Sequence, residues 1–130
     1  MIVLDTHVWW WSVSEPAQLS RKARQIITKT PPDQRAISSI SIWEFAMTVT
    51  RGRIELTISP DEWLDHAVNQ TGLTVFDLNS KIALESCNLP GNFHKDPADR
   101  IIVATARVNR SQLITKDHKI IEYPYVTTVW

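Results

Sequence analysis

The chain has 130 residues, of which 43% are hydrophobic and 22% charged, a balance that fits one globular domain over residues 1–130 and excludes a disordered chain. Fourteen acidic residues match fourteen basic ones, which excludes a protein that coats nucleic acid through bulk positive charge. Cys87 has no second cysteine to pair with, and no leader segment or bilayer-spanning apolar run is visible, so we expect a cytoplasmic protein without a membrane partner.

The first part of the chain reads as strand, helix, helix, strand. Residues 2–4 are a short apolar run that predicts a strand, and residues 6–13 follow it as a helix. Ser20 is placed to cap a second helix, which the proline pair beginning at Pro31 ends. Residues 35–38 then predict a second strand.

The middle of the chain contains two more helices, a strand and a further helix. Ser41 and Glu44 have the spacing of a capping box, which predicts that a helix begins here and runs over residues 42–51. The remaining patterns predict a helix at residues 60–70, a buried strand at 73–78 and a helix at 80–87.

The last part of the chain begins with the strongest helical pattern. Asp96 and Pro97 form a cap and first-turn pair ahead of the helix at residues 98–108. The patterns that follow predict a strand at residues 112–115, a short helix at 117–121 and an edge strand at 126–129. Strands that alternate with helices indicate an α/β fold, with a parallel sheet covered by helices on both faces.

Acidic residues stand at several of the predicted element boundaries: Asp5, Glu44, Asp99 and Asp117. Functional crevices of α/β folds lie outside the carboxyl ends of the strands, so we expect these acids to face one crevice. Two carboxylates about 6 Å apart repel by roughly 3 kcal/mol at an effective dielectric near 20. Such a cluster therefore calls for protonation or a cation, and oxygen ligands suit Mg²⁺ or Mn²⁺.

Each acid taken alone also has a purely structural interpretation. Asp5 can be a turn residue, Glu44 the second half of a capping box, and Asp99 an acid at a helix N-terminus. Asp96 and Asp117 can each cap a helix. The joint pattern favours a site over these separate explanations.

Four segments in chain order carry a resemblance to a known family: LDTHVWWW, SSISIWEFA, HKDPADRIIVATA and LITKDHKI. As an ordered set they resemble the acidic motifs of PIN-domain ribonucleases, and among these the VapC-type toxins of type II toxin–antitoxin systems that carry an H-x-D-P-x-D-R segment. The resemblance covers nearly the whole chain. It implies a three-layer α/β/α PIN-like fold, a Mg²⁺- or Mn²⁺-dependent endoribonuclease acting on RNA, an antitoxin that blocks the site, and a homodimer.

The resemblance also implies roles for individual residues. It carries the four catalytic acids over to Asp5, Glu44, Asp99 and Asp117. Of these, Asp5, Asp99 and Asp117 would hold the metal, and Glu44 would bind a metal or the attacking water, which displaces the 3′ oxygen of the phosphodiester. Supporting positions are Asp96, an extra acid of this variant; Thr115, which would orient water; and Arg100 and Lys116, which would bind phosphate, unless Arg100 pairs with a neighbouring acid.

Two other functions compete with this interpretation. A phosphatase resembling the haloacid dehalogenases would need a second aspartate two residues after Asp5, where this chain has His7. A non-catalytic PIN-like binding module would use the acids only to attract a basic partner, and the presence of all four acids argues against it.

Tryptophan and histidine complete the list of candidate residues. Trp9 is followed by two more tryptophans, and a helix cannot bury three successive side chains on one face, so at least one of the three should meet solvent or a partner. Trp43 and Trp63 occupy helical positions typical of a core. Histidines next to the motifs should serve as caps or hydrogen-bond partners, and the Cys87 thiol should be buried.

Overall fold

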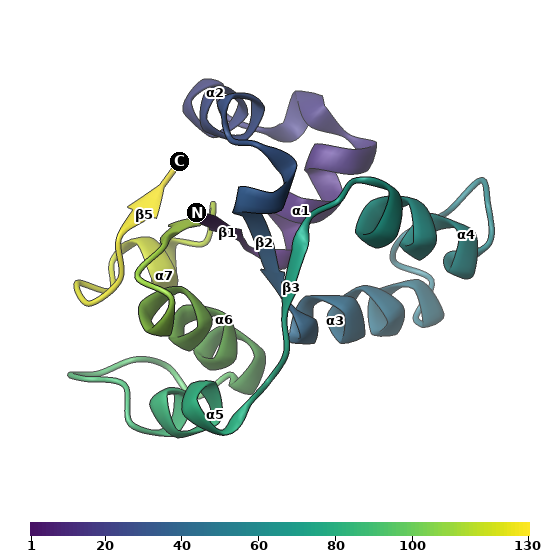
Figure 1. Cartoon of the computed structure of the whole chain (residues 1–130). Coiled ribbons are helices and arrows are strands. Elements are labelled where there is room, and N and C mark those ends of the chain that lie inside the picture. Colours follow the sequence, from purple (N-terminus) through teal and green to yellow (C-terminus); the bar gives the residue numbers. More distant parts are fainter.

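Five short strands form a single parallel sheet in the order β3-β2-β1-β4-β5 (Figure 1). The computed structural model that shows this sheet describes all of residues 1–130. Val3 of the central strand lies beside Ala36 on one side and Leu113 on the other. The strands are β1 (Ile2–Leu4), β2 (Arg35–Ser38), β3 (Thr74–Phe76), β4 (Gln112–Ile114) and β5 (Thr128–Val129).

Seven α-helices cover the two faces of the sheet, which confirms the expected three-layer α/β/α architecture (Figure 1). They are α1 (Thr6–Ser14), α2 (Arg21–Lys29), α3 (Ser39–Thr50), α4 (Pro60–Leu64), α5 (Ser80–Cys87), α6 (Pro97–Val108) and α7 (His118–Ile121). A π-helical segment, Asp65–Gln70, continues α4. None of the helices is long and apolar enough to cross a membrane.

Successive residues of the central strands enter two different hydrophobic cores. In β1, Ile2 and Leu4 belong to the core shared with α1 to α4, and Val3 belongs to the core shared with α5 to α7. In β4, Ile114 and Leu113 divide between the two cores in the same way. Because both faces of each central strand are buried, an uninterrupted apolar run marks a strand in this chain.

The burial of the tryptophans agrees only in part with the prediction made from the sequence. Trp63 is buried as expected, and its ring stacks on Phe45 with centroids 4.2 Å apart. Trp9 is fully buried, whereas the two tryptophans after it are half-buried, as a helix requires. The prediction for Trp43 is wrong, because 56% of this residue is exposed on α3.

Helix α3 begins three residues earlier than its capping-box pattern predicts. Ser38 is the N-cap, and its hydroxyl accepts a hydrogen bond from the backbone N–H of Ile40. Ser41 is therefore fully buried in the first turn, and Glu44 lies in the second turn. Two further predictions fail at the periphery of the fold, because β3 is a half-buried edge strand and Cys87 is exposed.

Candidate active site

The order of the strands creates a crevice beside β1. The chain passes from β1 to β2 and β3 on one side of the sheet and returns to β4 on the other side. Ligands of open α/β sheets bind where the strand order reverses in this way, outside the carboxyl ends of the strands. Asp5 directly follows β1, its backbone N–H donates to the carbonyl of Ile114 at 3.0 Å, and Asp117 lies just beyond the end of β4.

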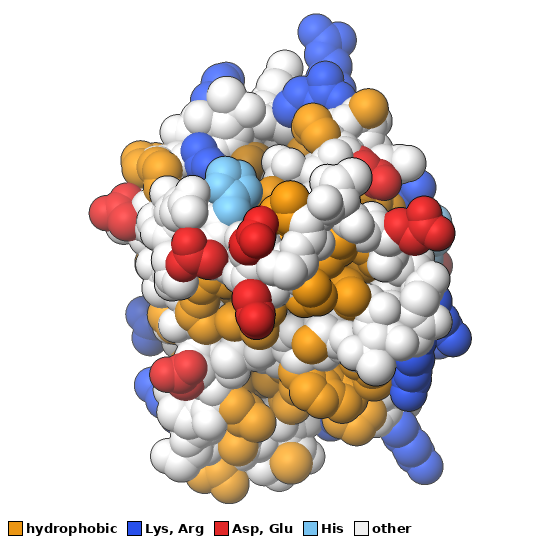
Figure 2. All heavy atoms as spheres, turned by 90° about the vertical axis from the view of Figure 1, so that its right-hand side faces the viewer, with side chains coloured by type: hydrophobic (Ala, Val, Ile, Leu, Met, Phe, Trp, Pro, Cys, Tyr) orange, Lys and Arg blue, Asp and Glu red, His pale blue; other side chains and the backbone are white.

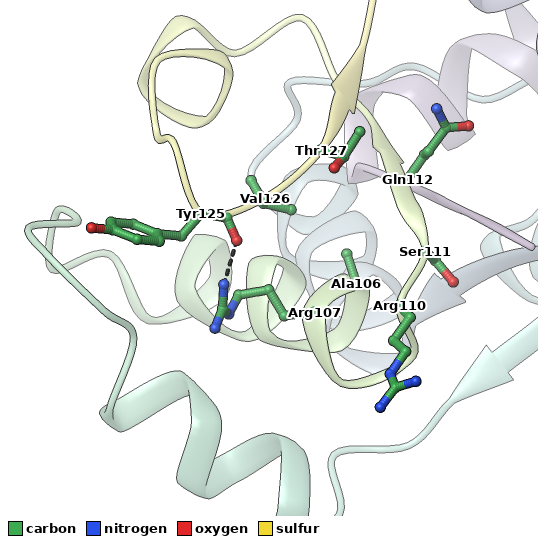
Figure 3. Close-up of a pocket in the computed structure, with 8 residues that line it drawn as sticks. All are labelled: Ala106, Arg107, Arg110, Ser111, Gln112, Tyr125, Val126 and Thr127. Atoms are coloured by element: carbon green, nitrogen blue, oxygen red, sulfur yellow. Dashed lines mark hydrogen bonds between the residues drawn. The ribbon is translucent and has the colours of Figure 1, made fainter.

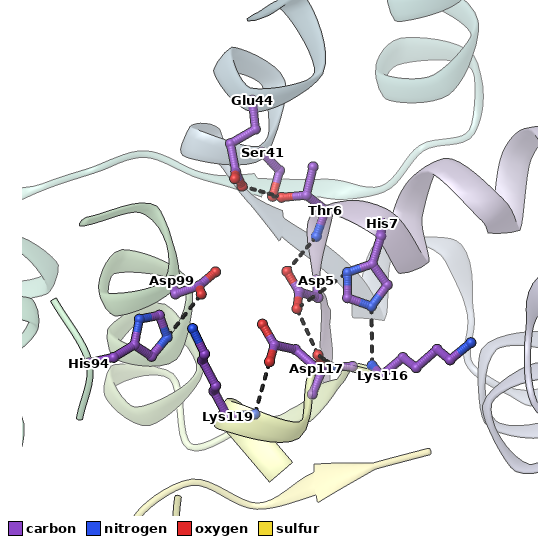
Figure 4. A network of polar contacts seen from close by, with 11 residues as sticks. Asp5, Thr6, His7, Ser41, Glu44, His94, Asp99, Lys116, Asp117 and Lys119 are labelled. Atoms are coloured by element: carbon purple, nitrogen blue, oxygen red, sulfur yellow. Dashed lines mark hydrogen bonds and ion pairs between the residues drawn. The ribbon is translucent and has the colours of Figure 1, made fainter. Parts of the chain in front are cut away.

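A cavity of about 250 Å³ at this position is lined by all four predicted acids: Asp5, Glu44, Asp99 and Asp117. Figure 4 shows these side chains converging from the ends of β1 and β4 and from the helices α3 and α6. Figure 2 views the molecule from the side of α3 and α4, and it shows acidic side chains gathered on one part of this face, with hydrophobic side chains next to them. The expected meeting of the four acids is confirmed. Asp96 lies next to them as the N-cap of α6, accepting a hydrogen bond from the backbone N–H of Asp99 at 3.1 Å.

Thr115 joins the two acids that follow the central strands. Its buried hydroxyl donates to Oδ2 of Asp5 at 2.7 Å and accepts a hydrogen bond from the backbone N–H of Asp117 at 3.0 Å. The hydroxyl has one proton, and it donates this proton in the hydrogen bond to the Asp5 carboxylate. Thr115 fixes the orientation of Asp5 and the position of Asp117, a contribution more specific than the water contact expected from the sequence.

Glu44 is held by a chain of hydroxyl groups that the sequence did not reveal. The Thr6 hydroxyl lies 2.6 Å from Oε1 of Glu44 and 2.8 Å from the Ser41 hydroxyl. Because Glu44 accepts and Thr6 has one proton, Ser41 donates to Thr6 and Thr6 donates to Glu44. The three-residue spacing of Ser41 and Glu44 is the one signal of this chain of hydroxyl groups in the sequence, and the same spacing also fits a capping box.

His94 is the partner of Asp99, with Nε2 of the ring 3.0 Å from Oδ2 of the carboxylate. Its Nδ1 accepts a hydrogen bond from the backbone N–H of Asp96, so the proton of a neutral ring resides on Nε2, which lies close to Asp99 but makes no hydrogen bond. His7 makes an analogous contact, since its Nε2 accepts from the backbone N–H of Lys116 at 3.1 Å. Both histidines are hydrogen-bond partners, as expected.

The acids raise one another's proton affinity. Burial, followed by the negative charges of Asp5, Asp96, Asp117 and Glu44, raises the pKa of Asp99 to about 7. Burial also raises the pKa of Glu44, while the hydrogen bond from Thr6 opposes this change. No lysine or arginine forms an ion pair with any of these carboxylates; the chain's one such pair joins Arg107 and Glu85. The cavity therefore gathers negative charge, and no lysine or arginine nitrogen lies within ion-pair distance of it.

The two basic residues expected to bind phosphate point elsewhere. The guanidinium of Arg100 donates to the backbone carbonyls of Ser86, Phe93 and His94, so the alternative that Arg100 pairs with a neighbouring acid is wrong. Lys116 extends away from the carboxylates, as Figure 4 shows, and its amino group lies 5.7 Å from the centre of the Trp11 ring. Neither side chain compensates the acids.

A second cavity, of about 370 Å³, lies at the opposite end of β4 (Figure 3). It is lined by the end of α6, the start of β4 and the segment before β5, and it contains Arg107 and Arg110. Arg107 is committed to Glu85 and to the carbonyl of Tyr125. No acid lines this cavity, so it lacks the chemistry gathered at the carboxyl ends of the strands.

Comparison with known proteins gives the family. The family model of the PIN domain matches residues 2–124. The chain belongs to the PIN domain family. It is also 34% identical over 131 residues to Ribonuclease VapC22 of Mycobacterium tuberculosis (strain ATCC 25618 / H37Rv), with 99% of this chain and 98% of the relative covered.

Solved structures share the fold of this PIN domain. A toxin–antitoxin complex from Klebsiella pneumoniae contains a chain with a TM-score of 0.70 and 23% identity, covering 98% of this chain and 97% of that one. VapBC2 from Rickettsia felis, bound to a DNA fragment from its promoter, gives a TM-score of 0.71 at 17% identity, with 99% and 98% covered. FitAcB from Neisseria gonorrhoeae gives 0.71 at 20% identity, with 100% and 97% covered.

The donor set of the PIN-domain cavity fits a hard divalent cation in its chemistry. All four acids offer carboxylate oxygens, no thiol lines the cavity, and their mutual repulsion is uncompensated by lysine or arginine. In this arrangement no three acidic, histidine or cysteine side chains are close enough to hold one ion by themselves. Mg²⁺ does not require such a cage, since it is commonly bound by one or two carboxylates together with water and substrate phosphate.

Proposed function

We propose that this chain is a single PIN domain over residues 1–130 that cleaves RNA as a metal-dependent endoribonuclease. The observation that carries the proposal is the cavity in which four carboxylates from distant segments meet without a lysine or arginine partner. A cluster of this kind destabilises the fold unless a ligand compensates it. The relation to a protein named as a ribonuclease supports RNA as the substrate.

Asp5, Asp99 and Asp117 would supply the carboxylates for Mg²⁺ or Mn²⁺ in this site, with one or two of them in direct contact with the ion. When bound, such a cation supplies Lewis acidity toward the phosphodiester and its leaving oxygen. Thr115 keeps the Asp5 carboxylate oriented, and His94 keeps Asp99 in place, so that both acids present their remaining oxygens to the cavity. This arrangement orients the ligands before RNA arrives.

Glu44 would accept the proton of the attacking water. Thr6 fixes one of its carboxylate oxygens, and burial raises its pKa, which makes it a better base than an exposed glutamate. A bond forms between the water oxygen and phosphorus, the bond from phosphorus to the 3′ oxygen breaks, and the water proton passes to Glu44. The 3′ oxygen leaves with a proton from solvent.

The proposed biological role is that of a VapC-type toxin that acts in the cytoplasm, is restrained by an antitoxin protein and forms a homodimer. The support is the relation to Ribonuclease VapC22, together with a fold shared with chains of toxin–antitoxin complexes. An antitoxin that occupies the acidic cavity would need positive charge, because no lysine or arginine of the chain forms an ion pair with the four acids.

Incubation of the protein with total RNA tests the enzymatic proposal directly. We expect cleavage with Mg²⁺ or Mn²⁺, no cleavage with EDTA, and at least a hundredfold slower cleavage by the Asp117→Asn variant. Binding of RNA without any cleavage in the presence of either metal would favour a non-catalytic binding module. Cleavage that persists in EDTA and in the Asp117→Asn variant would place the activity outside this cavity.

A further inference from the structure

Beside the acidic cavity lies an apolar groove of about 470 Å³ that the four acids do not explain. Helix α3 contributes one face to it, with Ile40, Trp43, Glu44 and Met47 at the spacing of successive turns. The start of α6 contributes the opposite side, from Asp96 to Ala98. Glu44 lines both this groove and the acidic cavity, so the two spaces adjoin.

Trp43 is the unusual residue of this groove. Each of the other five tryptophans has an aromatic ring as neighbour, whereas Trp43 has none. It is also the most exposed of the large aromatic side chains, at 56%. An exposed indole is an unfavourable surface group unless a ligand covers it, and its flat face suits another aromatic ring.

We propose that the Trp43 groove binds a nucleobase of the RNA, the one next to the phosphate that is cleaved. The inference rests on the proposed function, because it takes the neighbouring acids to be the cleavage site. A base in the groove borders Glu44 and hence the acidic cavity, which places it where a nucleotide next to the reacting phosphate would lie. Single-stranded RNA is recognised in this way, with unstacked bases lying on aromatic side chains.

The charges at the edge of the groove select the base over the phosphate backbone. Glu44 and Asp96 are hydrogen-bond acceptors with negative charge, which repel phosphate but accept N–H groups from the edges of bases. The groove is also small enough for a flat ring, since cavities of a few hundred Å³ are typical of small ligands. A second copy of this chain is the competing occupant, since an exposed apolar groove can also lie in an interface between copies.

Steady-state cleavage of a short labelled single-stranded RNA with Mn²⁺ tests the groove. Loss of one stacked base weakens binding roughly 5-fold to 150-fold, so Trp43→Ala should raise KM by that factor with kcat nearly unchanged. Trp43→Phe should retain most of the affinity, because it keeps an aromatic face. Leu84→Ala is the matched control, since Leu84 is 67% exposed on α5 and does not line the groove, and its KM should equal that of the wild type.

Removal of the base from the RNA gives an independent readout. After the cut is mapped, an abasic ribonucleotide is placed on either side of it. One of the two substitutions should raise KM for the wild type and leave KM for Trp43→Ala unchanged, since the contact is already absent there. The proposal would be overturned if, at both positions, the abasic substitution raised KM for Trp43→Ala by the same factor as for the wild type. An unchanged KM for Trp43→Ala would also overturn it.

Sedimentation velocity on the same samples distinguishes a nucleobase in the groove from a second copy of the chain. Weaker self-association of Trp43→Ala with an unchanged KM would assign the groove to a second copy of the chain and reject the nucleobase. A wild type that cleaves no RNA with Mn²⁺ would reject the proposed function and the subsite together. If the wild type cleaves RNA, Asp117→Asn does not, and Trp43→Ala has the KM of the wild type, the subsite alone is rejected.

Discussion

At the end of the sheet where β4 begins, Arg107 has an acidic partner, and we call this the paired end; at the other end, where β1 and β4 finish, the four acids have no lysine or arginine partner, and we call this the unpaired end. Arg107 donates to the Glu85 carboxylate at 2.8 Å and to the carbonyl of Tyr125. At the other end, four acids share a cavity of about 250 Å³ without a lysine or arginine partner. The formal charge of the whole chain is zero, so the difference is one of placement.

This difference indicates where the fold gives up stability for function. Each pair of carboxylates at close range costs on the order of a few kcal/mol, against a total stability of about 5–15 kcal/mol for an ordinary domain. The raised pKa of Asp99 records this cost, because burial and the neighbouring charges disfavour its ionised form. The paired end of the sheet serves as an internal reference for every experiment on the unpaired end.

The largest expected effect is on cleavage. Asp5→Asn, Asp99→Asn and Asp117→Asn each remove one charge without a change in volume, and we expect each to lower kcat/KM for RNA by at least a hundredfold. Glu85→Gln, the same kind of change at the paired end, should leave kcat/KM within about twofold of the wild type.

Circular dichroism shows whether these four variants keep the fold. If two of the three aspartate variants cleave RNA at the wild-type rate while folded, the four-acid cavity is not the active site. A comparable loss in Glu85→Gln would mean that the two ends are coupled, and the contrast between them would not hold.

The second effect is stabilisation by metal. A ligand that binds only the folded protein adds RT ln(1 + [L]/Kd), about 2.7 kcal/mol at a hundredfold excess over Kd. For a domain of this size that corresponds to a rise in Tm of roughly 5–10 °C. The rise with Mn²⁺ should shrink in Asp5→Asn and persist in Glu85→Gln. Equal rises in both variants would place the bound ion away from the acids.

The third effect is a pH dependence of stability without metal. The pKa of Asp99 is about 7 in the folded chain against about 4 when unfolded, so the protonated acid is favoured on folding. Stability from this group is present below pH 4 and is lost as the pH rises through 7. Asp99→Asn should therefore be more stable than the wild type at pH 8 by roughly 4 kcal/mol, and the advantage should vanish near pH 4.

Urea denaturation in EDTA at several pH values measures this difference. The Glu85→Gln variant should follow the wild-type profile in parallel over the same range. A constant difference between Asp99→Asn and the wild type at every pH would show that Asp99 has an ordinary pKa in the folded protein.

The acidic end of the sheet was largely predictable from the sequence. The apolar runs that end at Asp5 and before Asp117, together with the alternation of strands and helices, determine which ends of the strands meet. That meeting brings the acids together, and the structure confirms it. Elements with both faces buried are the easiest to predict, because their hydrophobic pattern leaves few alternatives.

The details that failed depend on contacts between segments distant in the chain. The run SSIS offers several serines as caps, and the choice of Ser38 frees Ser41 to contact Thr6, 35 residues away. Trp43 has helical spacing typical of a core, but the groove beside it leaves it exposed. Arg100 lies beside Asp99 in sequence, yet the helix directs it to carbonyls of the preceding segments. Patterns of neighbouring residues in the sequence do not predict such long-range contacts.

The smallest expected effect concerns the paired end itself. The Glu85 and Arg107 side chains are each nearly one-third exposed, and ion pairs of this kind contribute roughly 0–1 kcal/mol. Glu85→Gln keeps an acceptor for Arg107, so we expect a loss of about 0.5 kcal/mol in the free energy of unfolding, measured by urea denaturation at low salt. Added NaCl should remove the difference, because salt screens partly exposed charges.

The Arg107→Ala variant should lose more stability than Glu85→Gln, since it also removes the hydrogen bond to the carbonyl of Tyr125 ahead of β5. A loss of several kcal/mol in Glu85→Gln that survives high salt would show that this pair is a buried structural element and not a partly exposed surface pair.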